Sequence, residues 1–339
     1  MKRLTIIAAA LGSFCLAPLA FSADAIGIFE KIHESSVSFE ETTAALESAI
    51  AASSLELHGS HDIRVPEGKH KARVYVLTSP TYQAAAAAER PRTASAQVLR
   101  VAVYTMGDAQ TTYINMANPV AHAMVFYSKS ENYDALVSAA ASVADEIRAA
   151  AKSVPGKAVS AQLKPARTEK KFRKFNGDGP AKMMAKFRNW EESQLTIREA
   201  SAGAFDETVD SVAAALAAGT VAGPEDCDGW EVVTQIRLSD DVVYFGLTNP
   251  FIEDKTVRIN SRFRSDGKTE AAPFPGVDHM SALPTDLLVV NDGNLTRVVH
   301  YGQMWRMQLY FWDSGYRAFT ANMGVPGTIA DSIDDAIGQ

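Results

Sequence analysis

Mostly apolar residues recur every three or four positions in two separate stretches of the chain, residues 39–50 and 205–216. The recurring positions are Phe39, Thr43, Leu46 and Ile50 in the first stretch and Phe205, Val209, Val212 and Leu216 in the second. This spacing places one stripe along a helix and leaves the other sides to solvent. The pattern therefore predicts two amphipathic helices, each with one buried face.

The residues at the start of each stretch support this prediction. Ser38 and Glu41 have the spacing of a capping box, in which each side chain accepts a hydrogen bond from a backbone N–H of the other residue. The second stretch has Ala204 at the cap position, and Asp206 and Glu207 behind it suit the positive end of a helix. We expect the first helix to begin at a side-chain cap and the second at an acidic first turn.

The same kinds of β-rich run follow both predicted helices. Each pair of runs ends in a Leu-Thr-x-Pro corner, "VYVLTSP" at Pro80 and "VVYFGLTNP" at Pro250, where proline stops the strand. A further pair surrounds a Gly-containing turn, in "AQVLRVAVYTMGDAQTTYINM" and again in "PTDLLVVNDGNLTRVVHYGQM". A last run, "AHAMVFYS" in the first copy and "WRMQLYFW" in the second, is predicted as another strand. The repeated order of elements predicts a duplicated module.

A closing helix is predicted at the end of each copy. In the first copy it runs from Ser130 to Lys152, and in the second from about Pro326 to Ile337. The buried stripe of the longer helix consists of Tyr133, Leu136, Ala140, Val143 and Ile147. The predicted fold class is α+β, an antiparallel sheet with helices packed on one face, made twice.

These elements divide the chain into four parts. Residues 1–23 precede the first module, residues 27–154 form it, residues 155–192 connect the modules, and residues 193–338 form the second, more divergent module. The connector is rich in Lys and Arg and is broken by Pro and Gly, in a chain whose formal charge is −7. It is a candidate surface for anionic lipid, polysaccharide or nucleic acid. We expect instead that it contacts the acidic domains and binds no nucleic acid, because it has few aromatic residues for stacking.

The N-terminus has the pattern of a secretory signal peptide. Lys2 and Arg3 precede an apolar run to about Leu19, and small residues follow in "LAFSADA". We therefore expect export to the periplasm and cleavage near residue 23. No later run of the sequence is long and apolar enough to predict a transmembrane segment. Removal of Cys15 with the signal would leave Cys227 alone, so we expect the core and not disulfides to hold the fold.

The sequence resembles a known family, the DUF302 domain, a small bacterial and archaeal module of uncharacterised function. The likeness rests on "SFEETTAALESAI", on "VYVLTSP", and on the strand pairs that begin with "AQVLRVAVY" and "PTDLLVVNDG". It covers most of the first copy and, more loosely, the second, where the loop from Phe251 to Leu283 departs from the pattern. The resemblance implies two helix-grip-like modules, each with a curved sheet around a long helix. It implies no catalytic residues.

Three histidines near the second strand, His58, His61 and His70, are candidate metal ligands. His58 and His61 are three residues apart, so on a regular strand they point to opposite faces unless a bulge at Gly59 intervenes. Because a zinc site needs three or four converging ligands, surface histidines are the preferred interpretation and no metal site is predicted. Cys227 stands between two acidic residues, which disfavour a reactive thiolate.

The final run of the second copy provides the candidate ligand or interface residues. On a strand, Arg306, Gln308, Tyr310 and Trp312 would share one face, opposite an apolar row. This mixture of Arg, Gln, Tyr and Trp is typical of a sheet face that a ligand, a partner or the sister module covers. The sequence leaves these occupants open.

The sequence contains no catalytic, phosphate-binding or dinucleotide motif, and no cofactor is predicted. We expect an exported, non-catalytic protein that binds an unknown small molecule or protein. The alternatives are an enzyme acting on a small periplasmic substrate and a metal carrier that uses His58, His61 and His70.

Overall fold

A computed structural model describes most of the chain after the N-terminus. The described residues are 25–65, 68–175, 190–219, 227, 229–263, 276–311 and 320–338. Below, the first half means the described residues up to 175 and the second half those from 190 onward. Residues 1–23, predicted as a signal peptide, lie outside the described residues. No helix within the described ranges has both the length and the apolar character needed to cross a membrane.

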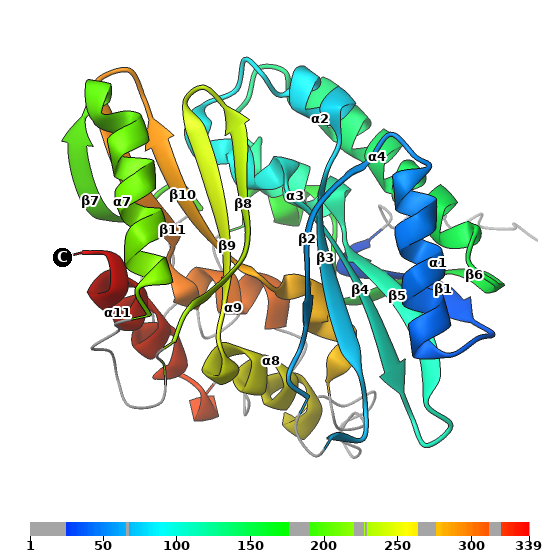
Figure 1. Ribbon diagram of the computed structural model, residues 1–339. Coiled ribbons are helices and arrows are strands. Elements are labelled where there is room, and N and C mark those ends of the chain that lie inside the picture. Colours follow the sequence, from blue (N-terminus) through cyan, green and yellow to red (C-terminus); the bar gives the residue numbers. More distant parts are fainter. Residues whose placement is uncertain are drawn as a thin grey trace, which may run out of the picture.

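The first half contains a six-stranded antiparallel sheet. In spatial order its strands are β2 (Glu56–Asp62), β3 (Ala72–Thr78), β4 (Leu99–Met106), β5 (Thr111–Ala117), β1 (Ile26–Ser35) and β6 (Gly156–Arg167). Its helices are α1 (Phe39–Ala51), α2 (Pro80–Ala85), η2 (Pro91–Gln97), α3 (Pro119–Phe126), α4 (Tyr133–Lys152) and α5 (Glu169–Arg173). Both α1 and α4 pack on the sheet (Figure 1).

The second half contains a five-stranded antiparallel sheet. Its strands, in spatial order, are β8 (Glu231–Ser239), β9 (Val242–Thr248), β10 (Thr285–Asn291), β11 (Leu295–Tyr301) and β7 (Gln194–Ser201). Its helices are η3 (Ala202–Ala204), α7 (Phe205–Ala217), α8 (Pro250–Phe263), η4 (Val277–Ala282), α9 (Gln303–Phe311) and α11 (Val325–Ile337). The sequence order of elements and the spatial order of strands are the same as in the first half, except that the first sheet has β6 beyond β1. These two sheets with packed helices confirm the predicted α+β fold class.

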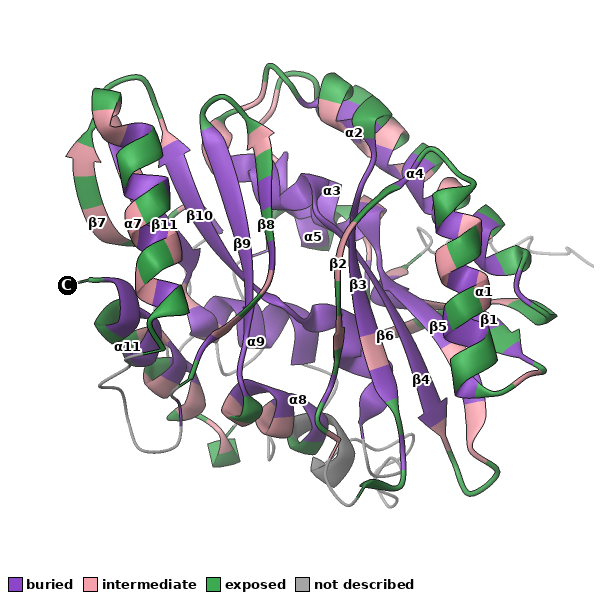
Figure 2. Ribbon diagram, in the orientation of Figure 1, coloured by how far each residue is buried: buried purple, intermediate pink, exposed green. Residues whose placement is uncertain are grey.

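The two halves cover each other's sheets. The 3-10 helix η4 of the second half packs on β3, β4 and β5 of the first sheet, and η2 of the first half packs on β9 and β10 of the second. Val74 and Ala102 therefore share a core cluster with Val277 and Met280. Each sheet thus has helices of its own half on one face and a short helix of the other half on the second face. Figure 2 shows the result, with central strands buried and α1 and α7 exposed along one side.

The amphipathic helices form where the sequence predicts them. Helix α1 begins at Ser38, whose side chain and that of Glu41 make both hydrogen bonds of the capping box. Helix α7 has Ala204 at its N-cap and an acidic first turn. Helix α4 buries the predicted stripe from Tyr133 to Ile147. These helices were predictable because each has one buried face, which gives a clear periodic signal.

The strands predicted at "AHAMVFYS" and "WRMQLYFW" are wrong, because residues 121–126 lie in α3 and residues 305–311 lie in α9. Asn118 caps α3 and Pro119 occupies its first turn, both of which favour a helix. Helix α9 is buried nearly all round, from Trp305 to Phe311. A helix without a solvent face has no helical periodicity, and its apolar residues can be mistaken for a strand.

The predicted connector contains regular structure. Gly156–Arg167 forms β6, which pairs antiparallel with β1, so this stretch is an edge strand of the first sheet and not a linker. The buried side chain of Arg167 donates a hydrogen bond to the Gln308 carbonyl oxygen at 3.4 Å. The predicted loop after Phe251 likewise begins as helix α8.

The edge strands β2 and β8 run side by side where the halves meet (Figure 1). The Thr234 hydroxyl of β8 donates a hydrogen bond to the His58 carbonyl oxygen of β2 at 3.1 Å. Gly59 makes this approach possible, since a Cβ there would lie 2.5 Å from the Val233 carbonyl oxygen.

We predict that Gly59→Ala lowers the free energy of unfolding by about 1–3 kcal/mol, because the added methyl group must push the two strands apart. Urea denaturation measures this change. Gly203→Ala is the matched control, since a Cβ at Gly203 meets nothing within 4 Å. Equal stability of the two variants would show that the strands tolerate a wider separation.

Candidate functional site

Helix α9 distributes the predicted candidate residues over different sides. Arg306, Gln308 and Tyr310 are all buried, and none has more than 4% of its surface exposed. On a helix, Arg306 and Tyr310 are four residues apart and share a side, whereas Gln308 points elsewhere. Trp312 lies outside the described residues, so its place beside them stays a prediction.

Tyr310 belongs to a buried polar group between the halves, here called the central cluster. It consists of Arg100, His122, Tyr244, Asp286 and Tyr310. The Tyr310 hydroxyl oxygen accepts a hydrogen bond from Arg100 Nη2 at 2.8 Å and lies 2.9 Å from His122 Nε2. Arg100 Nη1 donates to the Pro284 carbonyl oxygen at 3.1 Å and contacts Asp286 Oδ1 at 3.4 Å. The cluster therefore joins strands and helices of both halves.

Arg100 and Asp286 occupy equivalent positions in the two sheets. Leu77, in the first Leu-Thr-x-Pro corner, pairs with Leu99, and Leu247, in the second corner, pairs with Thr285. Arg100 and Asp286 are the next residues along β4 and β10. The repeated element order thus places a cation and an anion at matching positions, and they meet between the halves.

Burial fixes the protonation states of the cluster at neutral pH. It lowers the pKa of His122 well below its usual value, and the nearby charge of Arg100 lowers it further. Burial also raises the pKa of Tyr310, against the opposing effect of Arg100. His122 is therefore neutral and Tyr310 protonated. Each of the five groups is at most 3% exposed, which favours a structural role for the cluster.

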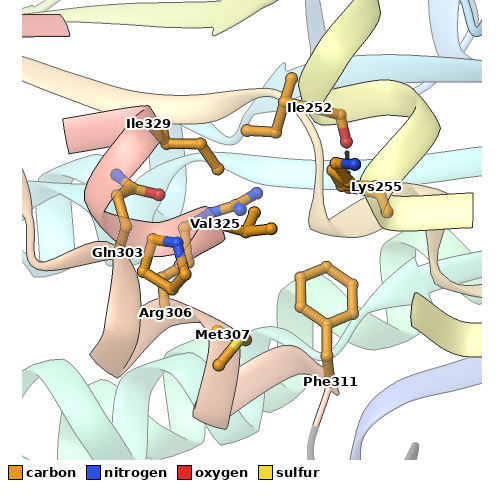
Figure 3. Close-up of a pocket in the computed structure, with 10 residues that line it drawn as sticks. Ile252, Lys255, Gln303, Arg306, Met307, Phe311, Val325 and Ile329 are labelled. Atoms are coloured by element: carbon orange, nitrogen blue, oxygen red, sulfur yellow. Dashed lines mark hydrogen bonds between the residues drawn. The ribbon is translucent and has the colours of Figure 1, made fainter. Parts of the chain in front are cut away.

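Arg306 faces a different space, a pocket between α8, α9 and α11, here called the α9 pocket. Its cavity volume is about 20 Å³, room for about one water molecule, within about 310 Å³ of space between atoms and open solvent. The lining residues are Ile252, Lys255, Thr256, Gln303, Arg306, Met307, Phe311, Val325, Pro326 and Ile329. Figure 3 shows the Arg306 side chain reaching from α9 toward the space between α8 and α11. The lining is mostly apolar, with Lys255 and Thr256 contributed by α8 and Gln303 and Arg306 by α9.

The charge of Arg306 has no carboxylate partner among the described residues. Its Nη2 donates to the Ala282 carbonyl oxygen, and its guanidinium carbon lies 5.5 Å from the Tyr310 ring centre. Its Nε has no hydrogen-bond partner in the described part of the chain. Burial lowers the pKa of Arg306, which expresses the cost of an uncompensated cation.

Gln303 lies one helical turn before Arg306 and also has a free polar atom. Its Nε2 donates to the Tyr301 carbonyl oxygen at 3.1 Å, which orients the amide. Its Oε1 is buried and accepts no hydrogen bond from any described residue. In Figure 3 this oxygen lies on the side of the amide nearer Arg306. The pocket wall therefore combines an unpaired donor group with an unpaired acceptor.

The sequence identified Arg306 but not Gln303, Lys255 or the pocket itself. The pocket depends on three helices, of which α9 was predicted as a strand and α8 as a loop. Only the positions of Arg306 and Gln308 within an otherwise apolar run signalled a buried polar site. Gln308 lies outside the pocket lining.

The three candidate metal-ligating histidines do not converge. The bulge at His58 moves the pairing from Leu57–Leu77 to Gly59–Val76, so the expectation that His58 and His61 face opposite sides is wrong. His58 Nε2 nevertheless contacts the Thr78 hydroxyl at 2.7 Å, and His61 Nε2 contacts Glu253 Oε1 at 2.8 Å. His70 lines another groove, beside α1. Within the described ranges no three His, Cys, Asp or Glu side chains form a possible metal site.

Comparison with known proteins does not assign this chain to a family. No protein-family model matches the sequence, and no curated protein matches it. A solved structure described as an uncharacterized conserved protein DUF302 from Bacillus stearothermophilus is similar to 37% of this chain and to 96% of its own, with 17% identity and a TM-score of 0.31. The fold described above rests on the strand order of the chain itself and not on this likeness.

We predict that His122 makes stability fall as the pH falls. Its folded pKa is below the unfolded value of about 6.5, so the unfolded chain binds the extra proton. The contribution is fully present above pH ~6.5 and is lost below it, by up to about 1.4 kcal/mol per pH unit. Urea unfolding between pH 7.5 and 5 should show a shallower dependence for His122→Gln. Equal slopes would contradict the burial of a neutral imidazole.

We also predict that metal does not stabilise the fold. Dialysis against a chelator should leave the melting temperature unchanged, because His58 and His61 are bonded to Thr78 and Glu253. A loss of several degrees that zinc restores would support the metal-carrier alternative.

Proposed function

We propose that this protein is a non-catalytic binding protein that holds a small molecule at the α9 pocket, which must widen around it because the pocket has room for about one water molecule. The observation that carries the proposal is Arg306, a buried cation without a carboxylate partner in the described structure, at the wall of an apolar pocket. Leaving a charged group unpaired and buried costs free energy, and a bound ligand offsets that cost. Arg306 is also one of the candidate residues predicted from the sequence, and it lines the pocket.

The chemistry of the wall favours binding over catalysis. Among the described lining residues the titratable groups are Arg306 and Lys255, both cationic, and none is a carboxylate, histidine or cysteine. The Thr256 hydroxyl donates to the Ile252 carbonyl oxygen at 2.6 Å. A general base or an activated nucleophile is therefore missing from this wall, which disfavours the enzyme alternative.

The residues at the equivalent positions of the first half differ from those that line the α9 pocket. Counting from the two Leu-Thr-x-Pro corners, Tyr82 corresponds to Ile252, and Ala85 and Ala86 correspond to Lys255 and Thr256. Tyr82 is fully buried there and packs edge-to-face on Tyr127 with ring centres 6.5 Å apart. The first half thus has a buried tyrosine and two alanines where the second half has Ile252, Lys255 and Thr256. Such a difference is expected where one copy has specialised for binding.

The broader interpretation is a duplication of one DUF302-like module, with the second copy adapted for binding. The shared element order and strand order support it. We further propose that the protein acts in the periplasm, on the evidence of the basic and apolar N-terminal residues 1–23.

Native mass spectrometry of the full chain, purified from its own source, tests the binding function. We predict a retained small mass on the wild type that Arg306→Met loses, while the melting temperature holds or rises. Methionine fills a similar volume without the buried charge, so the apo protein should not be destabilised.

The matched control is Arg258→Met. Arg258 is an exposed arginine of α8 that pairs with Asp254 and lies outside the pocket lining. This variant should keep the mass. If the wild type carries no added mass, or if Arg306→Met retains it, the α9 pocket is not the binding site.

A further inference from the structure

A second pocket, here called the junction pocket, lies between the two halves. Its lining residues fall between Gln83 and Gln97 in the first half and between Leu238 and Val242, around the turn from β8 to β9, in the second. Figure 1 shows α2 and this turn at the same end of the molecule. The junction pocket shares no lining residue with the α9 pocket, so the inference below is independent of the proposed function.

The junction pocket is large enough for a small ligand. Its cavity volume is about 230 Å³. This is room for roughly eight water molecules, and it is below the ~300–1,000 Å³ of pockets that take drug-sized ligands. A ligand of this pocket therefore has only a few carbon atoms.

The lining of the junction pocket is negatively charged. Glu89 comes from the first half, and Asp240 and Asp241 come from the second. Arg90 is the cationic residue among the described lining, and it already pairs with Glu191, which lies outside the lining. Three carboxylates and one guanidinium give the lining a formal charge of −2. The pocket therefore attracts cations and repels anions.

The three carboxylates do not converge on one point. Glu89, Asp240 and Asp241 all belong to the described ranges, within which no three His, Cys, Asp or Glu side chains form a possible metal site. A calcium or magnesium ion needs several oxygen ligands around one centre. A ligand with two separated positive charges can instead place one charge at each half. The distribution of the acids thus favours an extended dication over a metal ion.

The other walls suit an aliphatic chain with primary ammonium groups. Ala86, Ala94 and Val242 are buried and Leu238 is half-buried, and all four line the pocket, where they can cover methylene groups. None of the described lining residues is aromatic. Quaternary ammonium groups are bound by aromatic cages, whereas a primary ammonium group donates three hydrogen bonds to oxygen acceptors.

Gln97 provides a further acceptor in the lining. It is 8% exposed, so it is more than nine-tenths buried, and it lines the junction pocket. The Tyr127 hydroxyl lies near its amide, and within the described part of the chain no group donates a hydrogen bond to its amide oxygen. A buried acceptor without a donor costs free energy, and an ammonium group supplies the missing N–H.

We propose that the junction pocket binds a short aliphatic diamine. One ammonium group pairs with Glu89 of the first half, and the other pairs with Asp240 and Asp241 of the second. The bound diamine therefore bridges the two halves.

Isothermal titration calorimetry on the full chain at low ionic strength tests the proposal with a matched series. The compounds are 1,4-diaminobutane, butylamine, butane-1,4-diol and succinate. We expect the diamine to bind at least about tenfold more tightly than butylamine, because it makes one more hydrogen bond between charged groups. The diol and succinate should not bind, since the first has no charge and the second is repelled.

Two variants remove the charge of one half at a time. Glu89→Gln keeps the oxygen that accepts a hydrogen bond from the Ser130 hydroxyl. The second variant combines Asp240→Asn with Asp241→Asn in the exposed turn of the other half. Each should lower the affinity for the diamine to about that of the wild type for butylamine. Thermal melts show whether each variant is folded, and if Glu89→Gln is not, the aspartate variant decides.

The matched control is Glu131→Gln. Glu131 is exposed and lies outside the lining, and this variant should bind the diamine as the wild type does. A loss of the same size in the control, or equal binding of diamine and butylamine to the wild type, overturns the proposal, because the general negative charge of the protein then explains the attraction. Calcium binding that Glu89→Gln removes would instead identify a metal site and also overturn the diamine.

Discussion

The burial of Arg100 constrains how the two halves fit together. A guanidinium without solvent needs partners for its N–H groups, because its desolvation costs several kcal/mol. Arg100 has them at both Nη atoms, whereas its Nε has none among the described residues. All the partners described for Arg100, namely the Ala282 and Pro284 carbonyl oxygens, Asp286 and Tyr310, belong to the second half. The first sheet therefore cannot bury its own central strand favourably without the second half beside it. Asp286, at the equivalent position of the other sheet, makes the dependence mutual.

The exchange of 3-10 helices has the same consequence for the apolar residues. Val74 and Ala102 of the first sheet are covered by η4, and Tyr244 and Leu288 of the second share a cluster with Ala94 of η2. An isolated half would expose one whole sheet face to water, at a cost of roughly 25 cal/mol for each Å² of apolar surface. The halves therefore behave as one folding unit, although the sequence suggests two modules on a linker. Strand β6, which begins the predicted linker, also joins the halves, because Arg167 at its end donates a hydrogen bond to the Gln308 carbonyl oxygen.

The sequence predicted those elements whose neighbours are water on one side and core on the other. Helices α1, α4 and α7 have such surroundings, and their stripes and caps identified them. It failed for α3 and α9, because contacts from both halves bury these helices and no polar face remains to mark the period. The predicted arrangement of the candidate residues on one strand face was wrong for the same reason. Arg306, Gln308 and Tyr310 were grouped by strand alternation, whereas the helix sends Arg306 to a pocket and Tyr310 toward both Arg306 and the central cluster. The sequence raised a bulge at Gly59 only as an alternative, and the structure has the register shift between Leu57 and Gly59.

The two halves differ in the charge of one buried residue at equivalent positions. His122 on α3 corresponds to Arg306 on α9, since each lies six residues beyond matching partners of β4 and β10, Met116 and His300. His122 is neutral because burial lowers its pKa, and its Nε2 forms a hydrogen bond with the Tyr310 hydroxyl. Arg306 keeps a charge that its surroundings do not balance. The two halves therefore bury groups of different charge at equivalent positions, an imidazole beside a hydroxyl and a guanidinium that meets a carbonyl oxygen and an aromatic ring.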